Sequence, residues 1–418
     1  MARDDLMEKV VSLCKRRGFV YQGSEIYGGL AGMWDYAHYG LALKNNIKQL
    51  WWHTFVDSRD DMYGIDTAVI MNPKAWESSG HISSFADPLG DKMFNTMFKT
   101  SVGAGEEAMT AYLRPETAGG IFVNFKNVVD SFHPVLPFGI AQIGKVFRNE
   151  IAPRDFIFRV RELEQMEVEY FVRPSEWERY FEEWRKKVPG YLAAVGIDMD
   201  KVHELDVPDA ERAHYSKRTI DFEFDFPFGT KELCGLAYRT SFDLSAHERG
   251  SGVELRYVDQ ETGEKIVPHV IEPSFGVDRT VLAVLLSAYA EDDLGRSSAE
   301  ASEGKGEKRI LLKFNPSIAP VKAAVFPLLK NKPELVTKAR EIYSNLKSQI
   351  PNTMWDDNGN IGKRYRRQDE IGTPWCITVD FETLENNTVT VRDRDSGGQK
   401  RVEAEELVLI LQHGLAGY

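Results

Sequence analysis

The stretch GKVFRNEIAPRDFIFRVRELEQMEVEYF, residues 144–171, decides the fold of the N-terminal part of the chain. After Pro153 the residues alternate with a period of two, which is the pattern of a β-strand. One face carries arginines and then glutamates, and its members are Arg159, Arg161, Leu163, Gln165, Glu167, Glu169 and Phe171. Arg148 and Glu150 precede the turn, so we expect a β-hairpin that places them on the strand before this face.

Two interpretations fit this charged face. Guanidinium groups can bind phosphate through paired hydrogen bonds, and Phe158, at the end of the turn, is suited to stack on a base. An exposed sheet surface crossed by salt bridges would show the same spacing. The spacing alone does not separate the two interpretations.

Other segments extend the sheet and back it with helices. Residues 219–228 alternate cleanly, with Ile220, Phe222, Phe224 and Phe226 on one side and Asp221, Glu223 and Asp225 on the other. Residues 41–56 predict a helix with Leu43, Ile47, Leu50 and Phe55 near one face and Trp51 beside it. Together with the hairpin, these patterns predict an α+β fold with an antiparallel sheet flanked by helices.

The composition changes near residue 291. Residues 291–308 are small, polar and charged, which is typical of a linker. Beyond them, strands predicted at 309–314, 375–380 and 388–393 alternate with helices predicted at 333–350 and 405–415. We therefore predict a first domain at 1–295, a linker at 296–307 and an α/β domain at 308–418.

Bulk composition excludes several classes of protein. The 418 residues include 64 acidic and 52 basic side chains, a net charge of −12, so any nucleic acid must be bound by local basic patches. Three cysteines, far apart, predict neither a disulfide framework nor a cysteine-rich zinc site. The N-terminus lacks a signal-peptide pattern, and the longest apolar run, near 281–290, is too short to span a bilayer. We expect a cytoplasmic protein that does not enter the membrane.

Two further motifs are candidates for chemistry. In VIEPSFGVDRTVLAVLL, residues 270–286, a turn leads into a helix with Asp278 and Arg279 in its first turn. Helix N-termini favour anions and an arginine adds a full charge, although Arg279 paired with a nearby acid is the alternative. In AYLRPETAGGIFVNF, residues 111–125, Glu116 either caps a helix that starts near Thr117 or points into a cleft.

Common nucleotide and hydrolase motifs are absent. The sequence contains no GxxxxGK[ST], no GxGxxG after a strand, no HExxH and no GxSxG. A nucleotide would therefore be bound by arginines on an antiparallel sheet.

Four segments, in order, resemble the class II aminoacyl-tRNA synthetases, and within that class the glycyl-tRNA synthetase family. They are LRPETA, FRNEIAPRDFIFRVRELEQMEVEYF, FPFGTKEL and VIEPSFGVDR. The resemblance runs from about residue 5 to the C-terminus, where it matches an anticodon-binding domain. It implies a homodimer that uses ATP and Mg²⁺ to attach glycine to tRNA(Gly) through a glycyl-adenylate.

The resemblance also implies roles for individual residues. The 41–73 region would build the dimer interface. Arg148 would bridge the ATP α-phosphate and the substrate carboxylate, and Arg279 would hold the γ-phosphate; these two are the expected catalytic residues. Glu150, Phe158 and the backbone near Arg161 would contact adenine, and Glu232 would help hold Mg²⁺. The expected ATP-binding residues are Arg148, Asn149, Glu150, Phe158, Arg159, Val160, Arg161, Glu162, Leu163, Glu232, Leu233, Gly276, Val277, Asp278 and Arg279.

For glycine, the resemblance implies a pocket in which Glu116, Glu167 and Ser274 surround the ammonium group. The expected glycine-binding residues are Glu116, Leu163, Glu164, Gln165, Met166, Glu167, Glu272, Pro273, Ser274, Phe275 and Gly276. A pocket shaped for the smallest amino acid rejects larger ones by steric clash, so no editing domain is required.

The chain departs from this family in two places. Many relatives carry Gln where this chain has Gly119, so any contact of that side chain is missing. The region 86–110 lacks a longer, often cysteine-bearing insert, and we therefore expect no zinc.

The stretch KRYRRQDEIG, residues 363–372, is the candidate for tRNA contact in the C-terminal domain. Lys363, Arg364, Arg366 and Arg367 are suited to phosphate, while a solvated loop with internal pairs to Asp369 and Glu370 is the alternative.

Two rival functions were weighed against this assignment. One is a synthetase for another small amino acid, and the other is an inactive paralogue that serves as a nucleic-acid-binding accessory subunit. The presence of Arg148, Glu150, Glu232 and Arg279 argues against the inactive paralogue.

Overall fold

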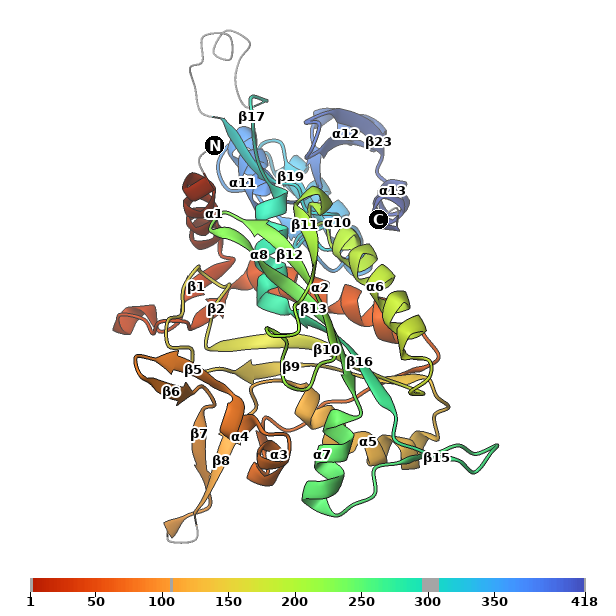
Figure 1. Ribbon diagram of the computed structural model, residues 1–418. Helices are drawn as coiled ribbons and strands as arrows, with labels where there is room; N and C mark the ends of the chain where they lie inside the picture. The colour runs from red at the N-terminus through yellow and green to blue at the C-terminus, as the bar shows by residue number, and fades with distance from the viewer. Residues whose placement is uncertain (1–2, 106–107, 295–307, 417–418) are drawn as a thin grey trace.

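A seven-stranded sheet organises the N-terminal part of the computed structural model, which describes residues 3–105, 108–294 and 308–416 (Figure 1). Neighbouring strands are antiparallel except for the parallel pair β3 and β9. The strand order is β11 (Val202–Asp206), β12 (Arg218–Phe226), β13 (Gly229–Thr240), β16 (His269–Gly276), β10 (Glu162–Val172), β9 (Phe138–Phe147) and β3 (Met62–Gly64). The expected antiparallel α+β architecture is confirmed.

Helices cover one face of this sheet. They are α1 (Arg3–Arg17), α2 (His38–Trp52), α6 (Trp177–Ala194) and α8 (Val277–Ala288). From β10, Met166, Val168 and Tyr170 enter this core, as the alternation predicts. In α2 the buried stripe runs through Trp51, while Leu50 lies only partly buried at its margin.

The opposite face is only half covered. Helix α5 (Ala118–Phe132) packs over one end of β9 and β10, where Phe138 and Phe171 join a second apolar core. Helix α7 (Phe242–Ser251) packs against α5. The polar residues of β10, including Gln165 and Glu167, lie beyond these helices and face an open cavity. The sheet therefore carries a core on one face and a candidate site on the other.

Short elements complete the N-terminal part. The remaining strands are β1 (Val20–Gln22), β2 (Trp34–Tyr36), β4 (Ile70–Met71), β5 (Ala86–Leu89), β6 (Lys92–Asn95), β7 (Lys99–Val102), β8 (Met109–Leu113), β14 (Tyr257–Val258) and β15 (Lys265–Ile266). The short helices are η1 (Glu25–Tyr27), η2 (His53–Asp57), α3 (Pro73–Ser78), α4 (His81–Ser84) and η4 (Met199–Lys201).

The hairpin at 144–171 differs in one respect from the prediction. Strand β9 ends at Phe147 and β10 begins at Glu162, so Arg148 and Glu150 lie in the connection and not on a strand. The backbone N–H of Arg148 still donates to the Arg161 carbonyl oxygen at 2.9 Å, which continues the pairing by one step.

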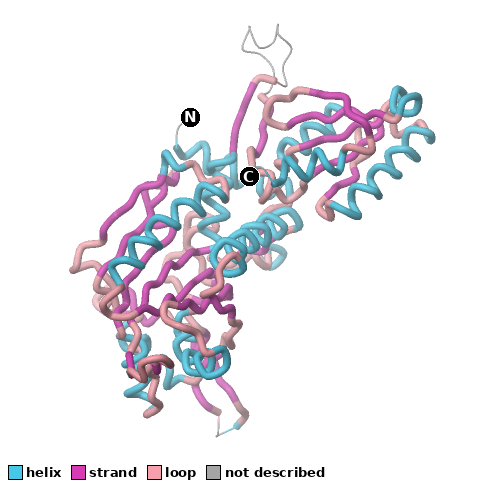
Figure 2. The backbone as a smooth tube through the Cα atoms, turned by 90° about the vertical axis from the view of Figure 1, so that its right-hand side faces the viewer, coloured by secondary structure: helices cyan, strands magenta, loops and turns pink. Residues whose placement is uncertain are grey.

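The C-terminal part forms a separate α/β layer, which Figure 2 shows projecting from one end of the N-terminal body. Its sheet order is β20 (Thr353–Trp355), β19 (Ala323–Pro327), β21 (Trp375–Val379), β22 (Thr388–Asp393) and β23 (Gln399–Glu403). Helices α10 (Pro333–Gln349) and α13 (Leu407–Ala416) share one core with it, and α11 (Ile361–Ile371) packs on a second apolar cluster. A short helix, α12 (Phe381–Asn386), follows β21.

The strand expected at 309–314 forms, as β18 (Arg309–Leu312), but it does not join this sheet. It pairs antiparallel with β17 (Tyr289–Asp292), the strand that follows α8. The linker predicted at 296–307 lies outside the described residues. None of the described helices is long and apolar enough to cross a membrane.

Candidate active site

A cavity of about 300 Å³ opens on the uncovered half of the large sheet. Strands β10, β12, β13 and β16 form its floor, and the segment 207–215 contributes to its wall. Many of the residues expected at the site line this cavity. They are Glu116, Arg148, Phe158, Val160, Leu163, Gln165, Glu167, Glu232, Leu233, Glu272, Ser274, Gly276, Asp278 and Arg279. Its size and mixed polar lining suit a small-molecule substrate.

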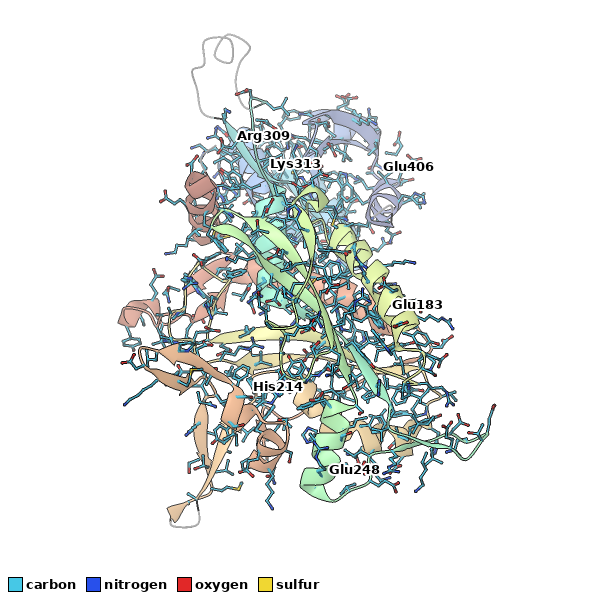
Figure 3. All side chains as sticks on the ribbon, in the orientation of Figure 1. Glu183, His214, Glu248, Arg309, Lys313 and Glu406 are labelled. Atoms are coloured by element: carbon cyan, nitrogen blue, oxygen red, sulfur yellow. The ribbon has the colours of Figure 1, made fainter. Side chains whose placement is uncertain are left out.

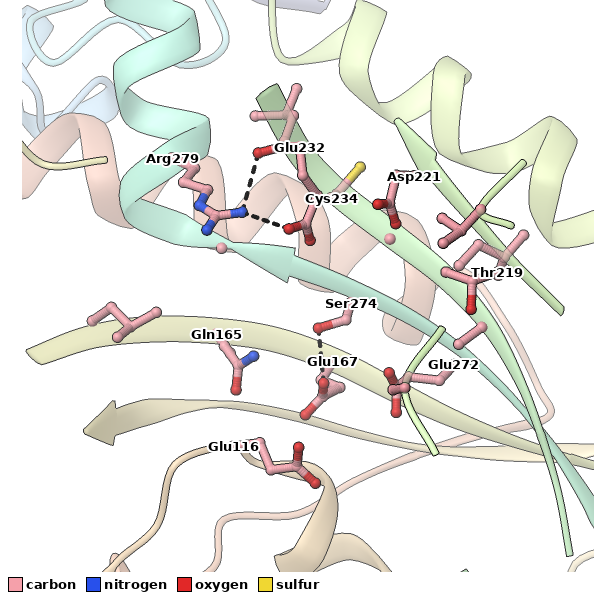
Figure 4. A pocket seen from close by; sticks show the side chains of 18 of the residues that line it. Glu116, Gln165, Glu167, Thr219, Asp221, Glu232, Cys234, Glu272, Ser274 and Arg279 are labelled. Carbon is pink, nitrogen blue, oxygen red and sulfur yellow. Dashed lines mark hydrogen bonds and ion pairs between the residues drawn. The ribbon is translucent and has the colours of Figure 1, made fainter. Parts of the chain in front are cut away.

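Two arginines from different elements, Arg279 and Arg148, line the cavity, and Figure 4 shows Arg279 at one end of it. Arg279, in the first turn of α8, donates from Nη1 to the Glu232 carboxylate at 3.0 Å and to the Glu232 carbonyl oxygen at 3.1 Å. Its guanidinium also lies 4.6 Å from the centre of the Phe158 ring. Arg148 donates from Nε to the Pro115 carbonyl oxygen at 3.0 Å. The two guanidinium groups can therefore neutralise negative charge in the cavity.

Carboxylates face these arginines because of a β-bulge. The register between β12 and β13 shifts at Leu233, and Glu232 thereby comes to lie opposite Glu223 on the cavity side. The charge of Arg279 lowers the pKa of Glu232. Burial and the neighbouring carboxylates of Glu232 and Glu223 raise the pKa of Asp221 to about 7.

Asp221 and Glu232 lie on either side of Gly235. A Cβ atom added to Gly235 would lie 3.6 Å from Asp221 Oδ1 and 4.0 Å from Glu232 Oε1. Paired carboxylate oxygens of this kind are the ligands that Mg²⁺ prefers.

At the other end, the residues expected around an ammonium group meet. Glu167 Oε1 accepts a hydrogen bond from Ser274 Oγ at 2.8 Å, and Oε2 accepts one from Thr117 Oγ1. Glu116 lies 3.3 Å from His81 Nε2 and lines the cavity, and α5 has no side-chain cap. The structure thus brings Glu116, Glu167 and Ser274 together, as expected from the sequence.

The charges at this end are unequal. Burial opposes ionisation of Glu116, but His81, Arg239 and Arg148 together lower its pKa to about 2. Burial and the charge of Glu116 raise the pKa of Glu167, although the two hydroxyl donors partly offset this effect. The site therefore holds at least one firmly ionised carboxylate.

Arg239 is the central residue that the sequence interpretation missed. It is 1% exposed, contacts Glu272 and donates to both carboxylate oxygens of Asp243 at 2.8 and 2.9 Å. Its guanidinium also lies 3.8 Å from the centre of the Tyr215 ring. The sequence offered one signal, because Arg239 follows an apolar strand, and a charge at such a position is expected to be buried and paired.

Other cavity residues were also missed. Asp221 was assigned only to the polar side of its strand, and Arg212 was not considered. Arg212 lines the cavity and donates to the carbonyl oxygens of Val207 and Lys217. His81 follows the turn at Gly80 and carries no periodic signal, so only the folded chain reveals its contact with Glu116.

Several expected site residues have side chains that face away from this cavity, so their expected contacts with substrate remain predictions that only their backbone atoms would make. Met166, Phe275 and Val277 are buried in the helical core. Pro273 alternates with Ser274 and lies on the same side as Phe275. Glu164 binds Lys44 and Lys48 at 3.0 and 2.9 Å. The cause is the two-residue period of a strand, which sends neighbouring side chains to opposite faces.

Asp278 also points away from the cavity centre. Its Oδ1 accepts hydrogen bonds from Tyr36 at 2.5 Å and Lys44 at 3.2 Å. Its Oδ2 accepts a hydrogen bond from the Glu164 backbone N–H at 2.9 Å. Asp278 thus anchors the start of α8, next to Arg279.

The connection 148–161 combines both interpretations of the charged face. Glu150 accepts a hydrogen bond from Arg159 Nε at 2.7 Å, so part of this face is a salt-bridged surface. Arg161 donates to the carbonyl oxygens of Glu150 and Ala31. The backbone N–H of Asn149 donates to Thr96. Glu162 pairs with Lys145 and does not line the cavity.

The basic stretch 363–372 is a helix, α11, and not the loop considered as the alternative. Arg364 is 1% exposed and donates to the carbonyl oxygens of Pro327, Asp357 and Gly359, so the prediction that it contacts tRNA is wrong. Arg367 binds Asp356 through two hydrogen bonds of 2.7 Å. Lys363 and Arg366 are exposed.

Comparison with known families and structures now adds to this geometry. Residues 98–289 match the tRNA synthetase class II core domain (G, H, P, S and T), and residues 322–413 match the anticodon binding domain. The solved structure of Giardia lamblia prolyl-tRNA synthetase in complex with prolyl-adenylate shares the fold, with a TM-score of 0.75 and 18% sequence identity over 100% of this chain and 80% of that chain. The fold and the two family matches define a class II aminoacyl-tRNA synthetase.

Three relatives narrow the assignment. The glycine–tRNA ligases of Thermobifida fusca and Clostridium acetobutylicum are each 45% identical, over 100% and 99% of this chain and 99% of each relative. The enzyme of Lachnospira eligens is 46% identical over 96% of this chain and 97% of its own length. The chain belongs to the glycine–tRNA ligase family. The first alignment spans 466 positions, more than the 418 residues of the chain, so that relative contains residues with no counterpart here.

Proposed function

We propose that this protein attaches glycine to tRNA(Gly) in two steps, with ATP and glycine as substrates and glycyl-adenylate as the intermediate. The observation that carries the proposal is the arrangement of one cavity. Arg279 lies at one end, Glu167, held by Thr117 and Ser274, lies at the other, and Arg148 also lines the cavity. A zwitterionic amino acid and a triphosphate need such a combination of charges.

In the first step, a carboxylate oxygen of glycine attacks the α-phosphorus of ATP, and the bond to pyrophosphate breaks. The step needs little proton transfer, so the protein contributes positioning and charge neutralisation. Arg148 would bridge the carboxylate and the α-phosphate, while Arg279 would hold the γ-phosphate. Phe158 would stack on adenine, which requires Arg279 to leave the Phe158 ring.

Mg²⁺ fits the carboxylates next to Arg279. Glu232 and Asp221 would hold it through their oxygen atoms. When bound, the ion would neutralise charge on the phosphates.

Specificity for glycine would arise at the carboxylate end. Glu116, Glu167 and Ser274 would accept hydrogen bonds from the ammonium group, and a pocket closed around it would leave no room for a side chain. The pocket would then reject alanine by steric clash, and no second sieve would be needed.

In the second step, the terminal ribose hydroxyl of tRNA attacks the activated carbonyl and AMP leaves. The C-terminal domain would bind the anticodon region. Lys363 and Arg366, exposed on α11, are the members of the basic stretch that would contact phosphates.

We further propose a cytoplasmic homodimer. The region 41–73 would contribute to its interface, and nearby Ile26 and Tyr27 expose 88% and 86% of their surface in the monomer. Sedimentation equilibrium should give twice the chain mass, and a monomer at micromolar concentration would contradict this assignment.

Glycine-dependent exchange between pyrophosphate and ATP tests the proposed reaction. Purified protein should catalyse exchange with glycine and not with alanine or serine, and should then charge tRNA(Gly). No exchange with any amino acid would refute the enzyme assignment. Exchange with a different amino acid would identify a different synthetase.

A further inference from the structure

Glu169 is a buried carboxyl group that the proposed reaction does not use. It follows Glu167 on β10, on the same face of the sheet, and none of its surface is exposed. Neither of its carboxyl oxygens has a hydrogen-bond partner in the structure. A buried carboxyl without a donor is costly, so its state requires an explanation.

The sheet register brings Glu169 against another acid. The pairs Glu167↔Ser274 and Tyr170↔Ile271 place Glu169 opposite Glu272 on β16. One carboxylate oxygen from each of Glu167, Glu169 and Glu272 lies within 4.8 Å of the others. Three ionised carboxylates at this separation would repel one another strongly inside the protein.

The cation and the hydrogen-bond donors near Glu169 bind its neighbours and not Glu169 itself. Arg239, on β13, contacts Glu272 and is also shared with Asp243 of α7. Glu167 accepts hydrogen bonds from Thr117 and Ser274. Glu169 has neither a guanidinium nor a hydroxyl partner, so it is the member of the cluster best suited to carry a proton. Burial raises the pKa of both acids: the pKa of Glu272 rises to about 8, with Arg239 offsetting part of the effect, whereas burial and the charge of Glu272 raise the pKa of Glu169 well above its usual range.

We propose that Glu169 is an uncharged carboxylic acid whose O–H group donates a hydrogen bond to the Glu272 carboxylate and so fixes the floor of the amino-acid pocket. Glu169 is thus a positioning residue and does not touch the substrate. Because Glu169 is neutral, less negative charge lies behind Glu167. The ammonium group of glycine neutralises the negative charge that remains. This role rests on the proposed function, because it assigns the same pocket to glycine.

Two substitutions test whether Glu169 acts as a hydrogen-bond donor, as an anion or by packing alone. The E169Q side chain is neutral, has nearly the same shape and can donate to Glu272. The E169L side chain is neutral and similar in volume but cannot donate. E183Q, on the exposed surface of α6 (Figure 3) and not among the residues that line the cavity, is the matched control for the change from carboxylate to amide.

The Michaelis constants for glycine and ATP in the exchange reaction are the readout. E169Q should keep the glycine KM within about threefold, whereas E169L should raise it about tenfold or more without changing the ATP KM. The glycine KM of the wild-type protein should rise at alkaline pH, where Glu169 ionises, and that of E169Q should rise less. Equal losses in E169Q and E169L would show an ionised Glu169, and equal retention would show a packing role; either result overturns the proposal.

Infrared difference spectroscopy provides a measurement that does not depend on catalysis. The difference spectrum of the wild-type protein minus E169Q should show, at neutral pH, a carbonyl stretch of a protonated carboxylic acid that only the wild type contributes. Absence of the band in folded wild-type protein overturns the proposal even if E169L fails to fold. Absence of glycine-dependent exchange in the wild type, with the band present, would contradict the proposed function and leave Glu169 protonated.

Discussion

Arg148 and Arg279 come from segments far apart in the chain and meet at the cavity. Arg148 ends the ladder of β9, and Arg279 begins α8. Neither is matched by a dedicated buried acid, because Arg148 donates to a backbone oxygen and Arg279 pairs with Glu232, a carboxylate that also lines the cavity. Both guanidinium groups are therefore available to a phosphorylated ligand.

Replacing either arginine should abolish activation of glycine. We expect R148A and R279A each to lower the exchange rate by about a thousandfold or more, because a guanidinium at a transferring phosphoryl group contributes on that scale. The thermal unfolding midpoint should change little, since neither residue fills the core. R179A, which removes an exposed arginine from α6, is the control. Near-wild-type exchange in R148A or R279A would refute its assigned role.

Asp221 should make stability depend on pH. Its pKa in the folded protein is about 7, against 3.8 for the ordinary side chain. The folded protein binds this proton more tightly than the unfolded chain does. The group therefore stabilises the fold at pH values below its ordinary pKa, and this stabilisation is lost as the pH rises toward 7. The Tm of wild type relative to D221N should therefore fall by a few degrees, roughly, between pH 4 and pH 7. A constant difference measured by scanning calorimetry would rule out this titration.

At the scale of elements, α8 is held by its second residue. Asp278 ties the start of α8 to β2, α2 and β10 through Tyr36, Lys44 and the Glu164 backbone. This anchor fixes the direction in which Arg279 leaves the helix.

Loosening the anchor should impair catalysis without removing a substrate contact. We expect D278N to lower kcat/KM for ATP in exchange by about tenfold, because a buried charged hydrogen-bonding group is lost and Lys44 is left without that partner. K48A is the matched control, since Lys48 contacts Glu164 and not Asp278, and it should cost less than about threefold. A larger effect in K48A than in D278N would count against this account.

Helix α11 carries two kinds of basic residue, the buried Arg364 and the exposed Lys363 and Arg366. We expect R364A to destabilise the C-terminal domain by about 3 kcal/mol, because one buried and two partly buried carbonyl groups lose their donor. The double variant K363A/R366A should unfold like the wild type but charge tRNA several-fold more slowly at low salt. Its exchange rate, which does not involve tRNA, should stay unchanged. Equal charging by the double variant and the wild type would remove α11 from the tRNA interface.

The sequence predicted those elements whose pattern is local. Strand β12 alternates as expected, and α10 begins at Pro333 because proline suits the first turn of a helix. The placement of β18 could not be predicted, because an isolated apolar strand does not reveal which distant strand it joins. The connection 148–161 resembles a strand in its alternation, although β9 ends at Phe147 and β10 begins only at Glu162.

At the scale of the whole molecule, the candidate site is an assembly that no single segment encodes. Glu116, Glu167 and Ser274 were found because the resemblance supplied their positions. His81 and Arg239 were missed, since their contacts join residues far apart in the sequence. Conversely, Glu164 and Phe275 are expected at the site because they lie within matched segments, but the two-residue period of their strands turns their side chains away from the cavity.

The pairing of β17 with β18 has a consequence for the continuity of the chain. These strands lie on either side of residues 295–307 in the sequence. Arg309 of β18, labelled in Figure 3, binds both Asp292 of β17 and Asp369 of α11. We therefore expect the two halves to stay associated without the peptide bonds between them. A protein expressed as separate 1–294 and 308–418 polypeptides should reassemble, co-purify and retain measurable exchange. Halves that stay apart would show that covalent connection, and not the paired strands, keeps the molecule together.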